Sequence, residues 1–87
     1  MSERLYADHE AESLGHFVML MGRELARNTH KKGWRTCTPK WLLMRLKQEV
    51  KELERALKKG DRTAIAEEAA DVGNFAMMVQ DKFWDRP

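Results

Sequence analysis

Residues 53–65 read LERALKKGDRTAI, and they contain the signals that end one helix and begin the next. A helix with apolar periodicity ends near Lys59, and Gly60 is a typical residue just past a helix end. Asp61 then stands where the next helix needs an N-cap. Two helices joined by so short a turn must lie antiparallel, so the stretch predicts a helical hairpin.

The two arms of the hairpin extend outward from this turn. The first begins with Thr38 as N-cap and Pro39 at the first helical position, and it runs to about Lys59. The second runs from Asp61 to about Trp84. Apolar residues alternate by three and four in both arms, which predicts a coiled-coil-like seam. The seam residues are Leu43, Leu46, Val50, Leu53 and Leu57 in the first arm, and Ile65, Ala69, Val72, Ala76, Val79 and Phe83 in the second.

A third helix is expected before the hairpin, from about Glu3 to about Asn28. Its apolar stripe repeats at helical spacing and consists of Leu14, Phe17, Met21 and Leu25. The polar and basic segment 29–37 is typical of a loop. The fold class is therefore all-α, with three helices forming one domain over residues 1–87. Because so small a core leaves apolar flanks open, we expect a homodimer or homotetramer that completes a four-helix-bundle core.

Composition narrows the classes of partner. The chain has 16 basic and 14 acidic residues, and a net charge of +2 is too balanced to predict a nucleic acid polymer as partner. Cys37 is the single cysteine, which excludes an intrachain disulfide and fits a reducing compartment. The longest apolar run, residues 17–21, is far shorter than the ~20 residues that a membrane span needs. With no signal peptide visible, we expect a cytoplasmic protein without a membrane partner.

Four acidic residues form a pattern that a solvated surface does not require. Glu49 and Glu52 are three apart on the first arm, and Glu68 and Asp71 are three apart on the second. Residues at this spacing point the same way, and both pairs flank an apolar seam. Converging carboxylates repel one another unless a proton or a hard divalent cation neutralises them. The alternative is that all four are ordinary surface acids, because such pairs arise easily in charged helices.

The four acids and their surroundings resemble the ExxE…ExxD signature of the MazG-like all-α nucleotide pyrophosphohydrolases. The signature letters are EVKE at 49–52 and EAAD at 68–71, and the similarity extends over roughly residues 33–82. The resemblance implies Mg²⁺ bound by Glu49, Glu52, Glu68 and Asp71, with Glu49 as the catalytic base. It also implies hydrolysis of a nucleoside triphosphate, a deoxy or non-canonical one included, to a monophosphate and pyrophosphate. One departure is Gly73, which stands where the family often has alanine.

Further residues are candidates for binding the substrate. Trp34 would stack on the base, and Lys31 and Lys32 in the same loop would contact phosphates. Asn74, one turn beyond Asp71, and Lys82 would reach the substrate from the second arm. Three of these residues also have a purely structural interpretation: Trp34 as an anchor of the loop, Asn74 as a helix-surface asparagine and Lys82 as a solvated lysine.

Two alternative functions stay open at the level of sequence. The first is phosphoribosyl-ATP pyrophosphohydrolase, a related enzyme with similar acids. The second is a non-catalytic helical module for oligomerisation or partner binding, in which the acids are incidental. Release of pyrophosphate in the presence of magnesium would separate the enzymes from the module.

Overall fold

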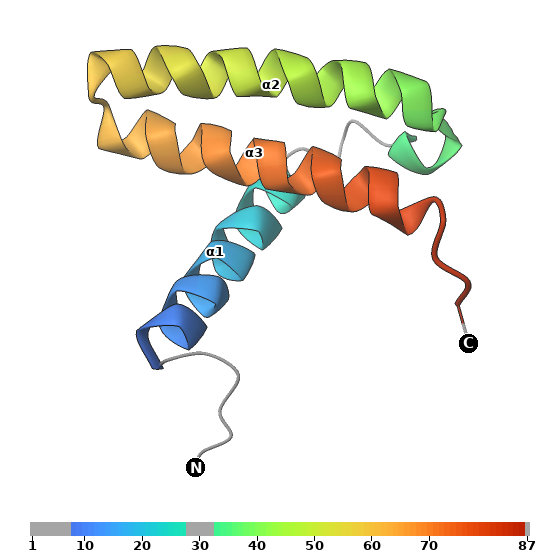
Figure 1. Ribbon diagram of the computed structural model, residues 1–87, viewed down its shortest axis with the longest axis horizontal. Helices are drawn as coiled ribbons and strands as arrows, with labels where there is room; N and C mark the ends of the chain where they lie inside the picture. Colours follow the sequence, from blue (N-terminus) through green and yellow to red (C-terminus); the bar gives the residue numbers. More distant parts are fainter. Residues whose placement is uncertain (1–7, 28–32, 87) are drawn as a thin grey trace.

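The computed structural model describes residues 8–27 and 33–86, and the regular elements in these ranges are all helical. In chain order they are α1 (Asp8–Arg27), the short 3₁₀ turn η1 (Trp34–Thr36), α2 (Pro39–Lys59) and α3 (Arg62–Asp81). Figure 1 shows α2 and α3 side by side and antiparallel, with α1 crossing α3 at a steep angle. The predicted all-α class and the central hairpin are confirmed. Among these helices none is long and apolar enough to cross a membrane.

Local hydrogen bonds explain where the hairpin helices begin and end. Gly60 has a φ of 70°, in the left-handed region, and its N–H donates to the carbonyls of Ala56 and Leu57. The Asp61 carboxylate accepts a bond of 3.1 Å from the Ala64 N–H, and the Thr38 hydroxyl accepts one of 3.1 Å from the Trp41 N–H. The predicted caps of α2 and α3 are confirmed.

The far end of α3 differs from the prediction, because the helix stops at Asp81 and not near Trp84. The N–H groups of Phe83 and Trp84 bond the carbonyls of Gln80 and Asp81, three residues back, so the chain tightens into a turn. Asp81 and Asp85 place negative charge where a helix C-terminus is already negative, which disfavours continuation. The predicted limits of the first helix, Glu3 and Asn28, lie outside the described residues.

The contact face of α2 also differs from the predicted seam. The buried side chains are Leu42 and Ala56 of α2, Ala70, Asn74 and Met78 of α3, and Leu20 and Glu24 of α1. Leu43, Val50 and Leu57, which were expected in the seam, are 44%, 42% and 58% exposed. The seam prediction is therefore wrong for these three residues in the single chain, whereas Leu46 and Leu53 are half-buried. Leu42, Glu49 and Ala56 share the face of α2 that packs against α3. Leu43, Val50 and Leu57 each follow one of these residues, so they are rotated from that face by about 100°, toward the surface.

Phe83, the last predicted seam residue of the second arm, is also outside the core, since it is 73% exposed. It follows the last residue of the helix by two positions, in the turn just described. No regular helical face therefore exists there to direct its ring toward α2.

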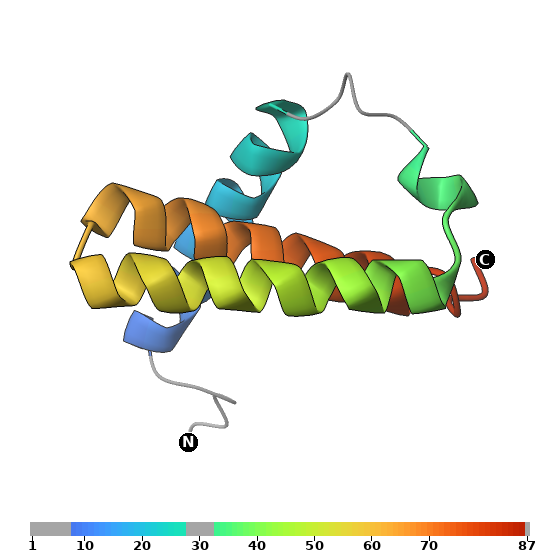
Figure 2. The ribbon, with the colours of Figure 1, turned by 90° about the horizontal axis from the view of Figure 1, so that it is seen from above.

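Helix α1 packs against α3 at Gly73. A Cβ atom at this position would lie 2.9 Å from Phe17 Cε2 and 3.2 Å from Met21 Sδ. The missing side chain therefore lets two apolar side chains of α1 approach the α3 backbone. Figure 2 shows that the C-terminal end of α1 and the η1 turn lie on the same side of the hairpin, so both overhang one face of α2 and α3.

Candidate active site

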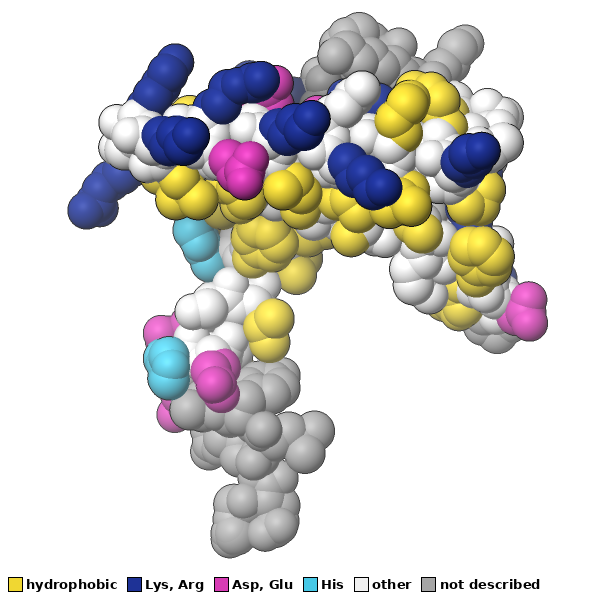
Figure 3. Space-filling view, turned by 45° about the horizontal axis from the view of Figure 1, so that its top comes forward, with side chains coloured by type: hydrophobic (Ala, Val, Ile, Leu, Met, Phe, Trp, Pro, Cys, Tyr) yellow, Lys and Arg dark blue, Asp and Glu magenta, His cyan; other side chains and the backbone are white. Residues whose placement is uncertain are grey.

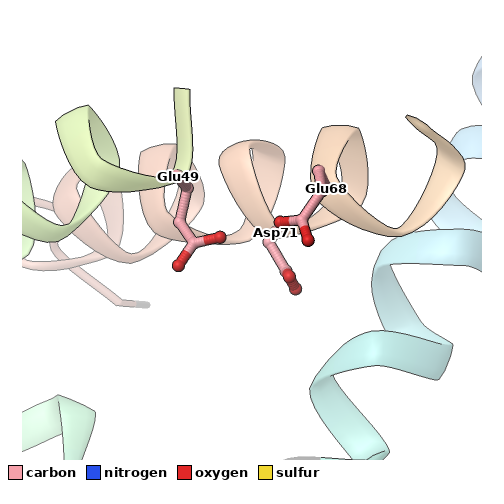
Figure 4. Close-up of side chains that lie close together, drawn as sticks. All are labelled: Glu49, Glu68 and Asp71. Carbon is pink, nitrogen blue, oxygen red and sulfur yellow. The ribbon is translucent and has the colours of Figure 1, made fainter. Parts of the chain in front are cut away.

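Three carboxylates from two helices meet on the hairpin. Glu49 comes from α2, and Glu68 and Asp71, one turn apart, come from α3. One carboxylate oxygen from each residue can be chosen so that the three oxygens all lie within 4.8 Å of one another. Figure 4 shows the three side chains directed into the same space from the two helices. All three are half-buried, so they share a partly desolvated site that remains accessible.

The charges of these acids oppose one another. The pKa of Glu68 is raised from 4.5 to about 7 by burial, then by its hydrogen bond to Glu49 and by the negative charges of Glu49, Asp71 and Glu52. The pKa of Asp71 is raised from 3.8 to about 6, first by burial and then by the charges of Glu49, Glu24 and Glu67. Both shifts have the same meaning: the ionised cluster is destabilised until protons or a cation neutralise it.

The fourth predicted acid, Glu52, is placed differently. Its carboxylate binds the Arg55 guanidinium at 2.7 Å, and its side chain is about half exposed. It lies outside the group of three oxygens, yet its charge reaches Glu68 and contributes to the raised pKa there. Glu52 therefore borders the cluster, and its side chain faces solvent and Arg55.

A cleft opens beside the acids on the face covered by α1 and η1, with a volume of about 460 Å³. Glu49 and Asp71 form one part of its wall, together with Arg45 and Asn74. The other part is apolar and aromatic and consists of Leu25, Trp34, Cys37, Trp41, Phe75 and Met78. The cleft thus joins a charged end, suited to cations and phosphates, to an end suited to a flat apolar ring.

The predicted substrate residues are distributed unevenly around this cleft. Trp34 lines it, half-buried, with the Arg35 guanidinium 4.6 Å from the centre of its ring. Asn74 also lines it and is buried; its Nδ2 donates to the Met21 carbonyl at 3.0 Å, and its Oδ1 has no hydrogen-bond partner within the described ranges. Lys82 does not line the cleft, because its ammonium group donates to the Arg35 carbonyl. Lys31 and Lys32 lie outside the described residues.

Two charged residues of the site escaped the sequence reasoning. Arg45 binds the Glu49 carboxylate at 3.0 Å and lies 5.0 Å from the centre of the Phe75 ring, so it stands between the two ends of the cleft. Its spacing of four residues from Glu49 was a usable signal. Glu24 is buried in α1 and acts on Asp71. No sequence spacing relates α1 to the hairpin, so Glu24 had no such signal.

Comparison with known proteins gives one result on the hairpin. Residues 37–78 match the model of the MazG nucleotide pyrophosphohydrolase domain. The matched segment contains all four acids of the signature, Arg45 and most of the cleft wall, whereas α1 lies outside it. The resemblance seen in the sequence is thereby confirmed. No curated protein and no solved structure gives a match.

Proposed function

Because residues 37–78 match the model of the MazG nucleotide pyrophosphohydrolase domain, we propose that the protein hydrolyses a nucleoside triphosphate, with magnesium as cofactor. The products are a nucleoside monophosphate and pyrophosphate, and the substrate is a deoxy, non-canonical or ordinary nucleotide. One observation carries the proposal: the carboxylates of Glu49, Glu68 and Asp71 converge at the charged end of a cleft whose other end is aromatic.

The donor set fits magnesium. Carboxylate oxygens are the ligands that this hard cation prefers, and it commonly takes its remaining ligands from water and substrate phosphates. Burial and then the neighbouring negative charges raise the pKa values of Glu68 and Asp71, so a bound cation would stabilise the ionised cluster. Glu49, Glu68 and Asp71 would hold the ion, with Glu52 joining after release from Arg55. Bound magnesium would supply charge neutralisation and Lewis-acid polarisation of the triphosphate.

The chain's own residues would orient the reaction. A water attacks the α-phosphorus, a new P–O bond forms, and the bond from the α-phosphorus to the bridging oxygen breaks, so that pyrophosphate leaves. Glu49 is the proposed acceptor of the proton from this water. Arg45 holds the Glu49 carboxylate at 3.0 Å, which fixes the direction of the side chain. In-line positioning of this kind supplies much of the catalysis in phosphoryl transfer.

The aromatic end of the cleft would receive the nucleoside. Trp34 and Trp41 offer flat rings of the kind on which bases stack. Asn74 lies one turn along α3 from Asp71, so it stands between the cation end and the aromatic end. We assign it to the nucleoside, and we assign Lys31 and Lys32 to the phosphates. Lys82 would act through the Arg35 carbonyl, by holding the loop that carries Trp34.

We further propose that the protein works as a homodimer or homotetramer in the cytoplasm. In the described chain, large apolar side chains stay exposed along α1 and α2 and in the turn after α3, including Leu14 and Val18 of α1 and Leu57 of α2. Figure 3 shows a band of hydrophobic side chains along the hairpin beneath a row of basic ones. A second copy covering this band would complete a bundle core. The single cysteine suits a reducing compartment.

The test is a panel of deoxy, ribo and modified nucleoside triphosphates, incubated with the protein and Mg²⁺ and scored separately for pyrophosphate and phosphate. Pyrophosphate and a monophosphate in equal amounts, abolished by EDTA, are expected. Phosphoribosyl-ATP is included in the panel, and its preferred hydrolysis would identify the protein as the related phosphoribosyl-ATP pyrophosphohydrolase. If the folded protein hydrolyses none of these nucleotides, the proposal is refuted in favour of the non-catalytic helical module.

A further inference from the structure

Helix α1 carries a buried acidic residue, Glu24, near the cluster formed by Glu49, Glu68 and Asp71. Glu24 is 6% exposed, and among the described residues it is the one acidic residue that is buried. Arg27, at the end of the same helix, binds Glu24 Oε2 at 2.9 Å and Glu67 Oε2 at 3.2 Å. One guanidinium thus joins α1 to α3 beside Glu68. Figure 4 shows the pale blue-green ribbon of α1 on this side of the cluster.

The charges of these three residues act on the cluster. The negative charges of Glu24 and Glu67 raise the pKa of Asp71, and the positive charge of Arg27 lowers it. Glu67 precedes Asp71 by one helical turn, which places its carboxylate at the edge of the same site. With Arg27 in place, Glu24, Arg27 and Glu67 together carry a charge of −1, and without it they would carry −2.

We propose that Glu24 and Arg27 are positioning residues of opposite sign for the divalent-cation site, Glu24 strengthening cation binding and Arg27 weakening it. The inference rests on the proposed function only in requiring that the acid cluster binds a cation. Burial keeps the Glu24 charge poorly screened, so a cation at Asp71 is attracted to it. Arg27 repels the same cation, and in exchange it compensates two flanking acids while the site is empty. The residues outside the matched domain therefore set the cation affinity of the residues inside it.

The experiment is calorimetric titration of MgCl₂ or MnCl₂ into the full chain at pH 8, without nucleotide. Glu24→Gln keeps the shape of the side chain and its ability to accept a bond from Arg27, and we expect the Kd to rise about tenfold. Arg27→Gln should lower the Kd severalfold, and the double variant should return close to the wild-type value. Glu12→Gln and Arg23→Gln make the same charge changes at exposed positions of α1 and should leave the Kd unchanged.

The outcomes separate this inference from the proposed function. If the two residues only dock α1, both single variants loosen the helix and shift the Kd in the same direction, which overturns the inference. A wild-type Kd in both single variants also overturns it, while the cation site itself stands. A wild-type chain that binds no cation overturns both. Should Glu24→Gln fail to fold by circular dichroism, Arg27→Gln decides, because its guanidinium is largely exposed: tighter binding supports the inference, and unchanged or weaker binding overturns it.

Discussion

Glu68 and Asp71 stand on one turn of α3, each beside further negative charge, and their pKa values are raised to about 7 and about 6. Repulsion and partial burial of these ionised carboxylates destabilise the folded state, and acids on an ordinary helix surface would not have this effect. The same arrangement gives a divalent cation several oxygens at once. Stability of the empty protein and affinity for the cation therefore oppose each other at these two residues.

Replacing Glu68 by glutamine tests this opposition. Glu68→Gln removes one charge from the cluster, so at pH 8 without metal we expect Tm to rise by a few degrees. The same change removes an oxygen charge from the site, and pyrophosphate release should fall at least about a hundredfold. Thermal melts in EDTA and a pyrophosphate assay measure the two effects. Glu54→Gln, an exposed acid of α2, is the control and should change neither.

The raised pKa values also predict how stability depends on pH. Because both folded-state values exceed the ordinary values of 4.5 and 3.8, the folded chain binds these protons more tightly than the unfolded chain. The two groups therefore favour the folded state at low pH, and this contribution is lost as pH rises through about 6 and about 7. Urea melts in EDTA at pH 5.5 and pH 8 measure it.

The matched reference for these melts is the double variant Glu68→Gln/Asp71→Asn, which lacks both titrating groups. Relative to this variant, the wild type should lose stability between pH 5.5 and pH 8. Addition of Mg²⁺ at pH 8 should restore the wild type and leave the variant unchanged. A constant difference between the two proteins across this pH window would refute the assignment of the shifts.

For individual residues, the sequence predicted which acids converge better than it predicted the partners and the cleft around them. The spacing of three within each pair and the shared hairpin were enough to bring Glu49, Glu68 and Asp71 together. Spacing could not predict that Glu52 turns to Arg55, because an exposed side chain chooses its partner by rotamer. Trp34 and Asn74 were recognised as candidates, but the cleft that contains them depends on how α1 and η1 lie over the hairpin.

Among the helices, the hairpin was predictable because its signals are local. Thr38, Pro39, Gly60 and Asp61 each act through hydrogen bonds or dihedral angles within a few residues, and their caps form as expected. The rotation of α2 about its axis was not predictable in the same way. Two neighbouring faces of α2 carry apolar residues, and which of them packs against α3 depends on the whole surface that α3 and α1 present.

The packing of α1 on α3 gives a prediction at Gly73. Alanine in a helix interior gains about 1 kcal/mol over glycine, and Gly22→Ala in α1, which has open space, should show this gain. At Gly73 the new methyl group would meet Phe17 and Met21 at 2.9 to 3.2 Å. We expect Gly73→Ala to be about 1 to 2 kcal/mol less favourable than Gly22→Ala. Chemical denaturation of both variants measures the difference, and equal gains would mean that α1 does not pack closely there.

The whole molecule is extended for a chain of this length, with principal dimensions of 44 × 43 × 21 Å. Helix α1 projects away from the hairpin over much of its length (Figure 1), and its exposed side chains include Leu14, Val18 and Met19. A monomer of this shape keeps apolar area in contact with water on two elements. At this scale the predicted bundle core is incomplete in one chain, which is the reason for proposing a second copy.

The position of that copy follows from a stripe on α2. Leu43, Val50 and Leu57 recur every seven residues and are all more than 40% exposed, a pattern typical of a helix that packs against another. Lysine in the middle of this stripe would have to be buried in the interface, and an unpaired buried ammonium is strongly disfavoured. We therefore expect Val50→Lys to sediment as a monomer near 10.2 kDa at micromolar concentration, whereas the wild type sediments as a dimer or tetramer. Thr63→Lys makes the same change of charge at an exposed residue of α3 and should leave the assembly intact. A wild-type mass of 10.2 kDa would refute the assembly, and an assembled Val50→Lys variant would place the interface away from this stripe.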